Sequence, residues 1–181
     1  KKRVAGAAKR LRGIARMRRK AHLGKFARMI NHSGAQPAIA YGHQVFGIAP
    51  SMMLRLRRQA AKAVAGKGFG RCLTTVLGLT DTTDDPGLAL PRQLRAEWLQ
   101  FWRHHPQHRQ RVRRAWVIIY RQLKARPPAR RWARARGAIS AVICTLLQAG
   151  WDAPTATRWR SDTDEEWQMS ETLDCDDAEL L

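Results

Sequence analysis

The chain has 181 residues, of which 34 are Lys or Arg and 14 are Asp or Glu, so its formal net charge at pH 7 is +20. The length fits one domain, or one domain plus a small appendage, and a hydrophobic content of 44% argues against a wholly disordered chain. The sequence has no apolar run of 18 residues and a strongly basic beginning, so we expect neither a membrane span nor a signal peptide. Because the first residue is Lys1, we expect a partial or processed chain. The expected location is intracellular, nuclear or cytoplasmic.

The charge is divided between a basic body and an acidic end. Residues 1–151 hold 32 Lys or Arg against four acids, whereas residues 152–181 hold ten acids against Arg158 and Arg160. When so basic a body folds compactly, its positive charges repel one another, and binding a polyanion reduces this repulsion. Arginine can bind a phosphate group through two parallel hydrogen bonds. The pattern favours a nucleic-acid partner. The alternative is a solvated basic surface in an arginine-biased composition; a membrane surface is disfavoured because no segment pairs a basic face with a broad apolar one.

The first half of the chain predicts helices. Residues 1–30 indicate one basic helix, because apolar residues recur at three-to-four spacing among the arginines. Ser51 is the expected N-cap of the next helix, which Gly66 ends. Residues 72–79 fit either a buried strand or two helical turns, and their helical neighbours favour the helix. The apolar stripe of the middle helix consists of Met53, Leu56, Ala60 and Val64.

Three longer helices are predicted to follow. Asp85 and Pro86 are the residue types expected at the N-cap and first turn of a helix that ends at Pro106. The second helix leads to Pro127, and the third runs from about residue 129 to 149. The inner faces of the first two helices are formed by Leu90, Leu94, Trp98, Phe101, Trp102, Val112, Ala115, Trp116, Ile119, Tyr120 and Leu123.

The last predicted element is a β-hairpin after Gly150, the expected cap of the third helix. Residues 157–160 and 166–169 alternate like two strands around a polar turn, so that Trp159 and Trp167 share one face. The expected fold class is therefore mainly α, a multi-helix domain with a small C-terminal β-hairpin.

Catalytic and metal-binding patterns are weak. Asp81, Asp84 and Asp85 invite comparison with the paired aspartates of a polymerase, but a helix cap in an acidic loop explains them better, since threonines precede them and Pro-Gly follows. His104 and His108 have metal-ligand spacing without a third ligand, so a solvated helix end is the preferred explanation. We expect no metal and no cofactor in this segment.

The cysteines and tryptophans favour packing roles. Cys72 and Cys144 lie in apolar runs and are expected to be inert core thiols, and no CxxC pair indicates a zinc ribbon or disulfide scaffold. Core packing is also the expectation for six of the seven tryptophans. Trp132 lies among arginines and is the one candidate for stacking on a base.

Several short strings carry a resemblance to a known family. They are Pro37 to Gly47, Leu56 to Ala61, Gly70 to Cys72, Gly137 to Asp152, and Trp159 to Trp167. In this order, after a basic arginine helix, they resemble the region that follows the palm in reverse transcriptases of non-LTR (LINE-type) retroelements, especially the dinoflagellate type. The resemblance implies a thumb and connection piece of an RNA-directed DNA polymerase. The catalytic aspartates of that family belong to the palm, and no residue here matches them.

The resemblance implies a role in holding a template–primer duplex through its phosphates. It divides the chain into a basic, helical thumb-like region at 1–126, a helix plus β-hairpin connection at 127–170, and an acidic tail at 171–181 that we expect to be disordered. The partner would be an RNA or DNA duplex, with no membrane. The candidate phosphate contacts are Arg12, Arg16, Arg19, Arg55, Arg58, Arg111, Arg114, Arg131 and Arg134.

Two interpretations from other classes stay open. The chain could be a degenerate open reading frame of a decayed retroelement, with no activity and no stable fold. It could also be a basic scaffold protein regulated by its acidic tail, because a tail that mimics phosphate can occupy the basic face of the same molecule.

Overall fold

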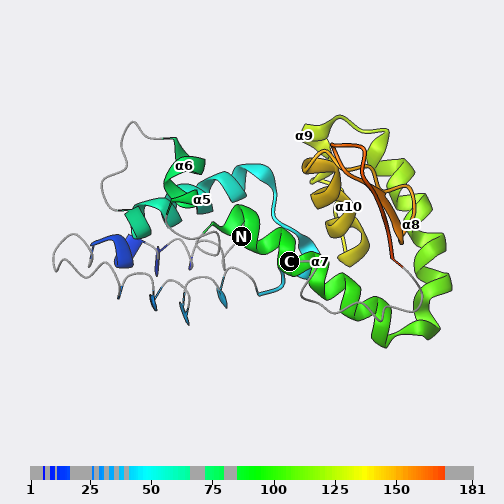
Figure 1. Cartoon of the computed structure of the whole chain (residues 1–181), viewed down its shortest axis with the longest axis horizontal. Coiled ribbons are helices and arrows are strands. Elements are labelled where there is room, and N and C mark those ends of the chain that lie inside the picture. The colour runs from blue at the N-terminus through cyan, green and yellow to red at the C-terminus, as the bar shows by residue number, and fades with distance from the viewer. Residues whose placement is uncertain are drawn as a thin grey trace. The chain divides into compact units, whose positions relative to one another are not determined.

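The computed structural model describes residues 41–65, 72–79 and 85–169, together with positions 6, 9–10, 12–16, 26, 29–30, 33–34 and 37–38. The chain forms two compact units, one of Lys1–His43 and Ile48–Pro91, the other of Gln44–Gly47 and Arg92–Leu181. Helices and one two-stranded antiparallel hairpin make up these units, which confirms the predicted fold class (Figure 1). The expected domain boundary after residue 126 lies inside the second unit. The acidic tail and most of the predicted helix over 1–30 lie outside the described residues.

The first unit is built around helix α5, Pro50–Ala65. Pro50 begins the helix because its fixed φ suits the first position and its missing N–H costs nothing there. The carbonyl of Ala49 accepts the first helical hydrogen bond, from the N–H of Met53 at 2.9 Å. The prediction of Ser51 as N-cap is therefore wrong, since Ser51 is already helical. The predicted cap Gly66 lies outside the described residues.

Helix α6, Leu73–Gly78, decides the strand-or-helix alternative in favour of a helix. It lies against α5 (Figure 1), where Val76 and Leu77 are buried beside Ala60 and Ala61. Cys72 precedes the helix and is exposed, so its predicted role as a core thiol is wrong. Hydrogen bonds from the backbone and side chain of Thr75 lower the pKa of this thiol.

Asp85 is the N-cap of helix α7, Pro86–His104, as predicted. Its Oδ1 accepts the backbone N–H of Gly87 at 2.8 Å. The same carboxylate is buried and pairs with Arg57, whose Nη2 lies 2.7 Å from Oδ2. A carboxylate fully occupied by a cap and a guanidinium is a structural group, which confirms the helix-cap interpretation for Asp85. Asp81 and Asp84 lie outside the described residues.

Pro91 lies in the interior of α7, at the point where the two units divide. A proline there removes one backbone N–H and therefore one helical hydrogen bond. Pro86–Pro91 belongs to the first unit and Arg92–His104 to the second.

The second unit continues with the short 3₁₀ helix η3, Pro106–His108, and helix α8, Arg109–Lys124. The single helix predicted over about 129–149 is wrong. The structure has a short α9, Pro128–Arg131, and a separate α10, Ala138–Gln148. Gly137 divides them with φ +94°, a conformation that no helix contains and that favours glycine.

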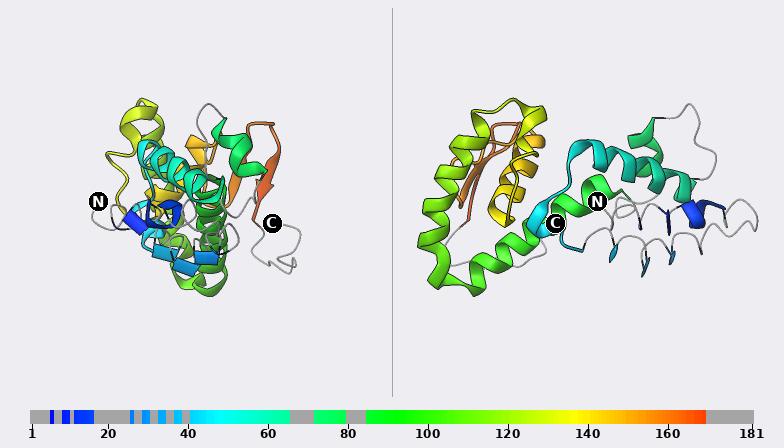
Figure 2. Two further views of the ribbon diagram at one scale, coloured as in Figure 1. Left: turned by 90° about the vertical axis from the view of Figure 1, so that its left-hand side faces the viewer. Right: turned by 180° about the vertical axis from the view of Figure 1, so that it is seen from behind.

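The C-terminal hairpin is confirmed. Strands β1, Arg158–Arg160, and β2, Glu166–Gln168, pair antiparallel, with Trp159 opposite Trp167 as predicted. Gly150 ends α10 with φ +85°, and the N–H of Trp151 reaches back to the carbonyl of Leu146 at 2.9 Å. Figure 2 shows α8, α10 and the hairpin side by side within this unit.

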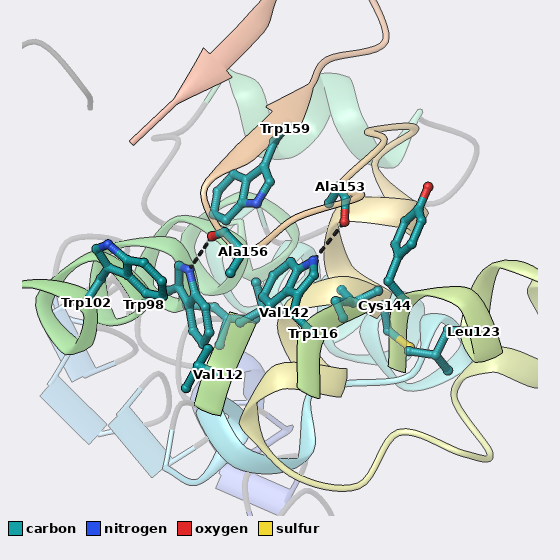
Figure 3. Packing of buried hydrophobic residues seen from close by; sticks show 13 residues of the cluster. Trp98, Trp102, Val112, Trp116, Leu123, Val142, Cys144, Ala153, Ala156 and Trp159 are labelled. Atoms are coloured by element: carbon teal, nitrogen blue, oxygen red, sulfur yellow. Dashed lines mark hydrogen bonds between the residues drawn. The ribbon is translucent and has the colours of Figure 1, made fainter. Parts of the chain in front are cut away.

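Four tryptophans form the centre of the second unit (Figure 3). Trp98 and Trp102 come from α7, Trp116 from α8 and Trp159 from β1, and each is at most 5% exposed. The indole N–H of Trp116 donates to the carbonyl of Ala153 at 2.8 Å, and that of Trp98 to Ala156 at 3.4 Å. These bonds attach the irregular segment before β1 to both helices. Trp102 and Trp159 differ, because Nε1 of each has no hydrogen-bond partner among the described residues.

The two fully buried indoles, Trp102 and Trp116, allow a matched test of this attachment. W116F and W102F remove the same atoms, but only W116F leaves a buried main-chain carbonyl without its donor. We expect W116F to lower the free energy of unfolding by about 1–3 kcal/mol more than W102F does. Urea denaturation followed by far-UV circular dichroism measures the difference. Equal losses for the two variants would show that the bond to Ala153 contributes nothing.

The hairpin turn contains a conformation that glycine adopts more easily. Asp164 has φ +62°, in the left-handed region, as the third residue of a three-residue loop that Ser161 and Glu165 flank. D164G should raise the free energy of unfolding by about 0.5 kcal/mol, because the removed strain exceeds the added unfolded-state entropy. D162G is the control, since Asp162 has an ordinary negative φ and its replacement by glycine should destabilise. Thermal melting of both variants distinguishes the two effects.

Candidate nucleic-acid interface

Helix α8 has one apolar side and one strongly basic side. Val112, Trp116, Tyr120 and Leu123 are buried against the rest of the second unit. The helix contains no acidic residue, and its exposed positions carry mostly Arg. The burial of the apolar side therefore fixes which arginines face solvent.

Three arginines follow one line along the exposed side of α8. Arg111, Arg114 and Arg121 are spaced three and seven residues apart, and the 59% exposed Ile118 lies between them on the same line. At 1.5 Å rise per residue, the line from Arg111 to Arg121 is about 15 Å long. Within the described part of the chain, none of the three guanidinium groups makes an ion pair or hydrogen bond. We name Arg111, Arg114 and Arg121 the α8 arginine line.

The beginning of α8 concentrates positive charge. Arg109, Arg111, Arg113 and Arg114 occupy its first two turns, and its first turn has no acidic residue. The helix dipole makes this end positive as well, so cations are unfavourable here and an anion is favourable. Each arginine thus adds to a potential that nothing on the same helix neutralises.

Two of these arginines have internal roles. The guanidinium carbons of Arg109 and Arg113 lie 5.6 and 5.5 Å from the ring centroid of Trp102. Nε of Arg109 also donates to the carbonyl of Trp102 at 2.9 Å. Arg109 and Arg113 therefore cover the buried indole, whereas the α8 arginine line remains open to a ligand.

At the other end of α8, one cation is neutralised. Nζ of Lys124 lies 2.6 Å from Oδ1 of Asp152 and 2.7 Å from the hydroxyl of Tyr120, and that hydroxyl also donates to Asp152. The hydrogen bond from Lys124 to Asp152 raises the pKa of the lysine. Partial burial alone would raise the pKa of Asp152, but the hydrogen bonds from Lys124 and Tyr120 outweigh it, so the pKa is lowered. Burial and then the bond to Asp152 raise the pKa of Tyr120.

Arg131, a predicted phosphate contact, caps the end of α8 instead. Its Nε donates to the carbonyls of Leu123 at 3.1 Å and Arg126 at 3.2 Å. The carbonyl of Leu123 also accepts the main-chain N–H of Arg126 at 3.2 Å, so Arg131 adds a second bond at the end of α8 and a bond to Arg126 just beyond it. Arg134 is exposed and lies on a hollow that Arg126 and Arg136 also line.

The remaining predicted contacts belong to the first unit. Arg55 and Arg58 are exposed on α5, and Arg12 and Arg16 are exposed helical residues. Arg19 lies outside the described residues. The structure therefore brings Arg111 and Arg114 together on α8 and adds Arg121, which the sequence analysis missed although its spacing of seven from Arg114 marks the same helix face.

Trp132 is half-buried and not an open stacking platform. Its ring covers Gly47, where a Cβ atom would lie 2.3 Å from Cζ3 of the indole. Its Nε1 donates to Oε1 of Gln148 at 3.1 Å. Gly47 has φ +63°, so both the conformation and the contact require glycine at that position.

Other candidate groups do not form a site. Within the described ranges, no three His, Cys, Asp or Glu side chains gather where they could hold a metal ion. His104, His105 and His108 are exposed. Cys144 is buried, as predicted, and burial raises the pKa of its thiol to about 11, which keeps it protonated and inert.

A cavity of about 460 Å³ lies between α7, α8 and α10, and its lining is mostly apolar. Glu97 is its one charged residue, and Oε1 of Glu97 accepts amide hydrogen bonds from Gln44 at 2.8 Å and Gln93 at 3.0 Å. A carboxylate at an apolar hollow repels phosphate, so this cavity is not part of the basic interface.

Comparison of the chain with protein-family models, curated proteins and solved structures finds no match. Among the helices of the described ranges, none combines the length and apolar character needed to cross a membrane.

The Asp152 cluster predicts a dependence of stability on acid. A carboxylate whose pKa is lowered by folding contributes stability above its unfolded pKa of about 3.8, and loses it as the pH falls through the folded value. The side chains of Lys124 and Asp152 are 52% and 41% exposed, so the contribution should be below about 1 kcal/mol. Between pH 5 and 2.5, D152N should lose less melting temperature than the wild type. D162N, which removes an exposed carboxylate, is the control and should follow the wild type; identical profiles for all three would contradict the assignment.

Proposed function

We propose that the protein holds a nucleic-acid duplex by its phosphates, as the resemblance to the thumb and connection region of LINE-type reverse transcriptases implies. One observation carries the proposal: the α8 arginine line is exposed and, within the described chain, free of carboxylate partners, and its first two arginines lie at the positive end of the helix. A polyanion relieves the mutual repulsion of these arginines and the unfavourable interaction of the first two with the helix dipole.

The dimensions of the line suit a phosphate backbone. About 15 Å of helix spans roughly four base-pair steps of duplex, at 3.4 Å per phosphate along one strand. Arginine binds phosphate through two parallel N–H groups, and Ile118 can lie against the sugar between them. Contacts of this kind fix the position of a duplex and are indifferent to its base sequence. That is the requirement for holding a template–primer of any sequence.

The composition of the second unit supports the same proposal. Residues 92–136 hold 14 Lys or Arg against Glu97 alone, and Glu97 is engaged by the amides of Gln44 and Gln93. Arg55 and Arg58 supply further exposed cations in the first unit. The proposed role is to bind, with chemistry supplied by a palm domain, as the resemblance implies.

Salt titration of duplex binding tests the proposal. The affinity of the wild type should fall steeply with NaCl, with log K decreasing by about 0.9 per log unit of salt for each phosphate neutralised. R111Q/R114Q should weaken binding and reduce the slope by about 1.8, because two phosphate contacts are lost.

R158Q/R160Q is the matched control. It removes the same charge from β1, where Arg158 makes only an exposed pair with Glu166 at 3.5 Å. It should change the slope far less than R111Q/R114Q does. A duplex affinity that does not change with salt concentration would contradict the proposal. Equal losses of duplex affinity in the two double variants would contradict the assignment of the phosphate contacts to α8.

A further inference from the structure

A small hollow between α8 and the start of α10 is lined mainly by basic and polar residues. We name it the arginine cavity. Its volume is about 300 Å³, and no carboxylate lines it. The lining consists of Ile119, Gln122, Leu123, Arg126, Arg134, Arg136 and Ser140.

Three arginines line the arginine cavity, and no carboxylate lies among its lining residues. Arg126 follows α8, and Arg134 and Arg136 belong to the loop between α9 and α10. All three are exposed, and within the described chain their guanidinium groups make no hydrogen bond or ion pair. Three like charges around one hollow repel one another, so their electrostatic interaction is unfavourable. An anion bound in the hollow attracts all three and makes the net electrostatic interaction favourable.

The beginning of α10 contributes Ser140 to the lining of the arginine cavity. Gly137 is its N-cap and has no side chain to accept the free N–H groups of the first turn. The hydroxyl of Ser140 is turned to the carbonyl of Gly137, at 2.8 Å, and so does not cap them either. Ala138 and Ile139, which begin the helix, line the apolar cavity instead, so the arginine side chains supply the charge that a phosphate would meet in the arginine cavity.

The local framework is held in place by Arg131. Its hydrogen bonds to the carbonyls of Leu123 and Arg126 fix the end of α8, from which Arg126 extends. The positive φ of Gly137 turns the chain into α10 directly after Arg136. The cavity is therefore a feature of the folded chain, formed before any ligand arrives.

The position of the cavity suggests where its ligand comes from. Ile119 and Gln122 are three residues apart on one side of α8, and Arg126 follows the end of the helix. That side adjoins the α8 arginine line, because Gln122 lies four residues after Ile118 and is therefore its neighbour on the helix surface. A strand that lies along the α8 arginine line would reach the arginine cavity with one end.

We infer that the arginine cavity binds a terminal phosphate group, that of a nucleic-acid strand whose duplex lies along α8. The inference rests on the proposed function and adds a preference for the chemistry of the strand end. The same cavity chemistry also fits free pyrophosphate, so an experiment has to separate the two sources.

The first arm compares two blunt duplexes of one sequence that differ only in a 5′-hydroxyl or a 5′-monophosphate. The wild type should bind the phosphorylated duplex about tenfold more tightly, the gain expected for one set of charge-assisted hydrogen bonds. R134Q/R136Q should lose this preference, and R134K/R136K should retain part of it, because the charge stays while the planar fork is lost. R111Q/R114Q should weaken both duplexes equally, and R158Q/R160Q should keep the wild-type ratio.

The second arm measures the melting temperature of the whole chain with inorganic pyrophosphate and no nucleic acid. If the cavity accepts a free phosphoanion, pyrophosphate raises the melting temperature of the wild type and of R158Q/R160Q but not of R134Q/R136Q. A rise in all three variants alike would place the anion elsewhere and overturn the inference.

The two arms separate this inference from the proposed function. Absence of duplex binding together with a pyrophosphate effect that R134Q/R136Q abolishes would contradict the proposed function and leave the cavity as a phosphate site. Duplex binding with equal affinity for both ends and no pyrophosphate effect would support the proposed function and overturn the inference.

Discussion

The second unit depends on two hydrogen bonds from buried indoles to main-chain carbonyls. Trp116 donates to Ala153 and Trp98 to Ala156, across an irregular segment that has no sheet or helix partner of its own there. A buried carbonyl without a donor costs about 1–3 kcal/mol, so these bonds decide whether the segment can be buried at all. With the segment in place, Trp159 stacks on Trp116 and the hairpin closes over α8. The inner side of α8 is then fixed, and the α8 arginine line faces solvent.

The fold uses some arginines and leaves others available, and the distinction follows from their surroundings. Arg57 pairs with the buried Asp85, Arg131 satisfies the last carbonyls of α8, and Arg109 covers Trp102. These groups have partners within the chain and contribute to packing. The α8 arginine line has no such partner among the described residues, and the carboxylate of Asp152, at the other end of α8, is engaged by Lys124 and Tyr120. Charge that the fold neither neutralises nor buries is the charge through which a polyanion would bind.

Much of the fold could be predicted from the sequence, because periodicity and caps are local signals. The inward positions of α7 and α8, the cap at Asp85, the cap at Gly150 and the Trp159–Trp167 register all follow from spacing and turn chemistry. The failures have physical causes: Gly137 breaks a pattern that periodicity extends through it, and Pro50 begins α5 one residue before the expected cap. The exposure of Cys72 depends on where α6 packs, which composition does not determine.

The candidate interface was less predictable, because a count of arginines does not tell a capping guanidinium from an exposed one. Arg131 was predicted to bind phosphate and caps a helix, whereas Arg121 was missed. Arginine modification with a dicarbonyl reagent, followed by peptide mass spectrometry with and without duplex, tests the central claim most directly. We expect Arg111, Arg114 and Arg121 to react in the free protein and to be protected by duplex, while Arg158 and Arg160 react equally in both states. Unchanged reactivity of the α8 arginine line in the presence of saturating duplex would contradict the account.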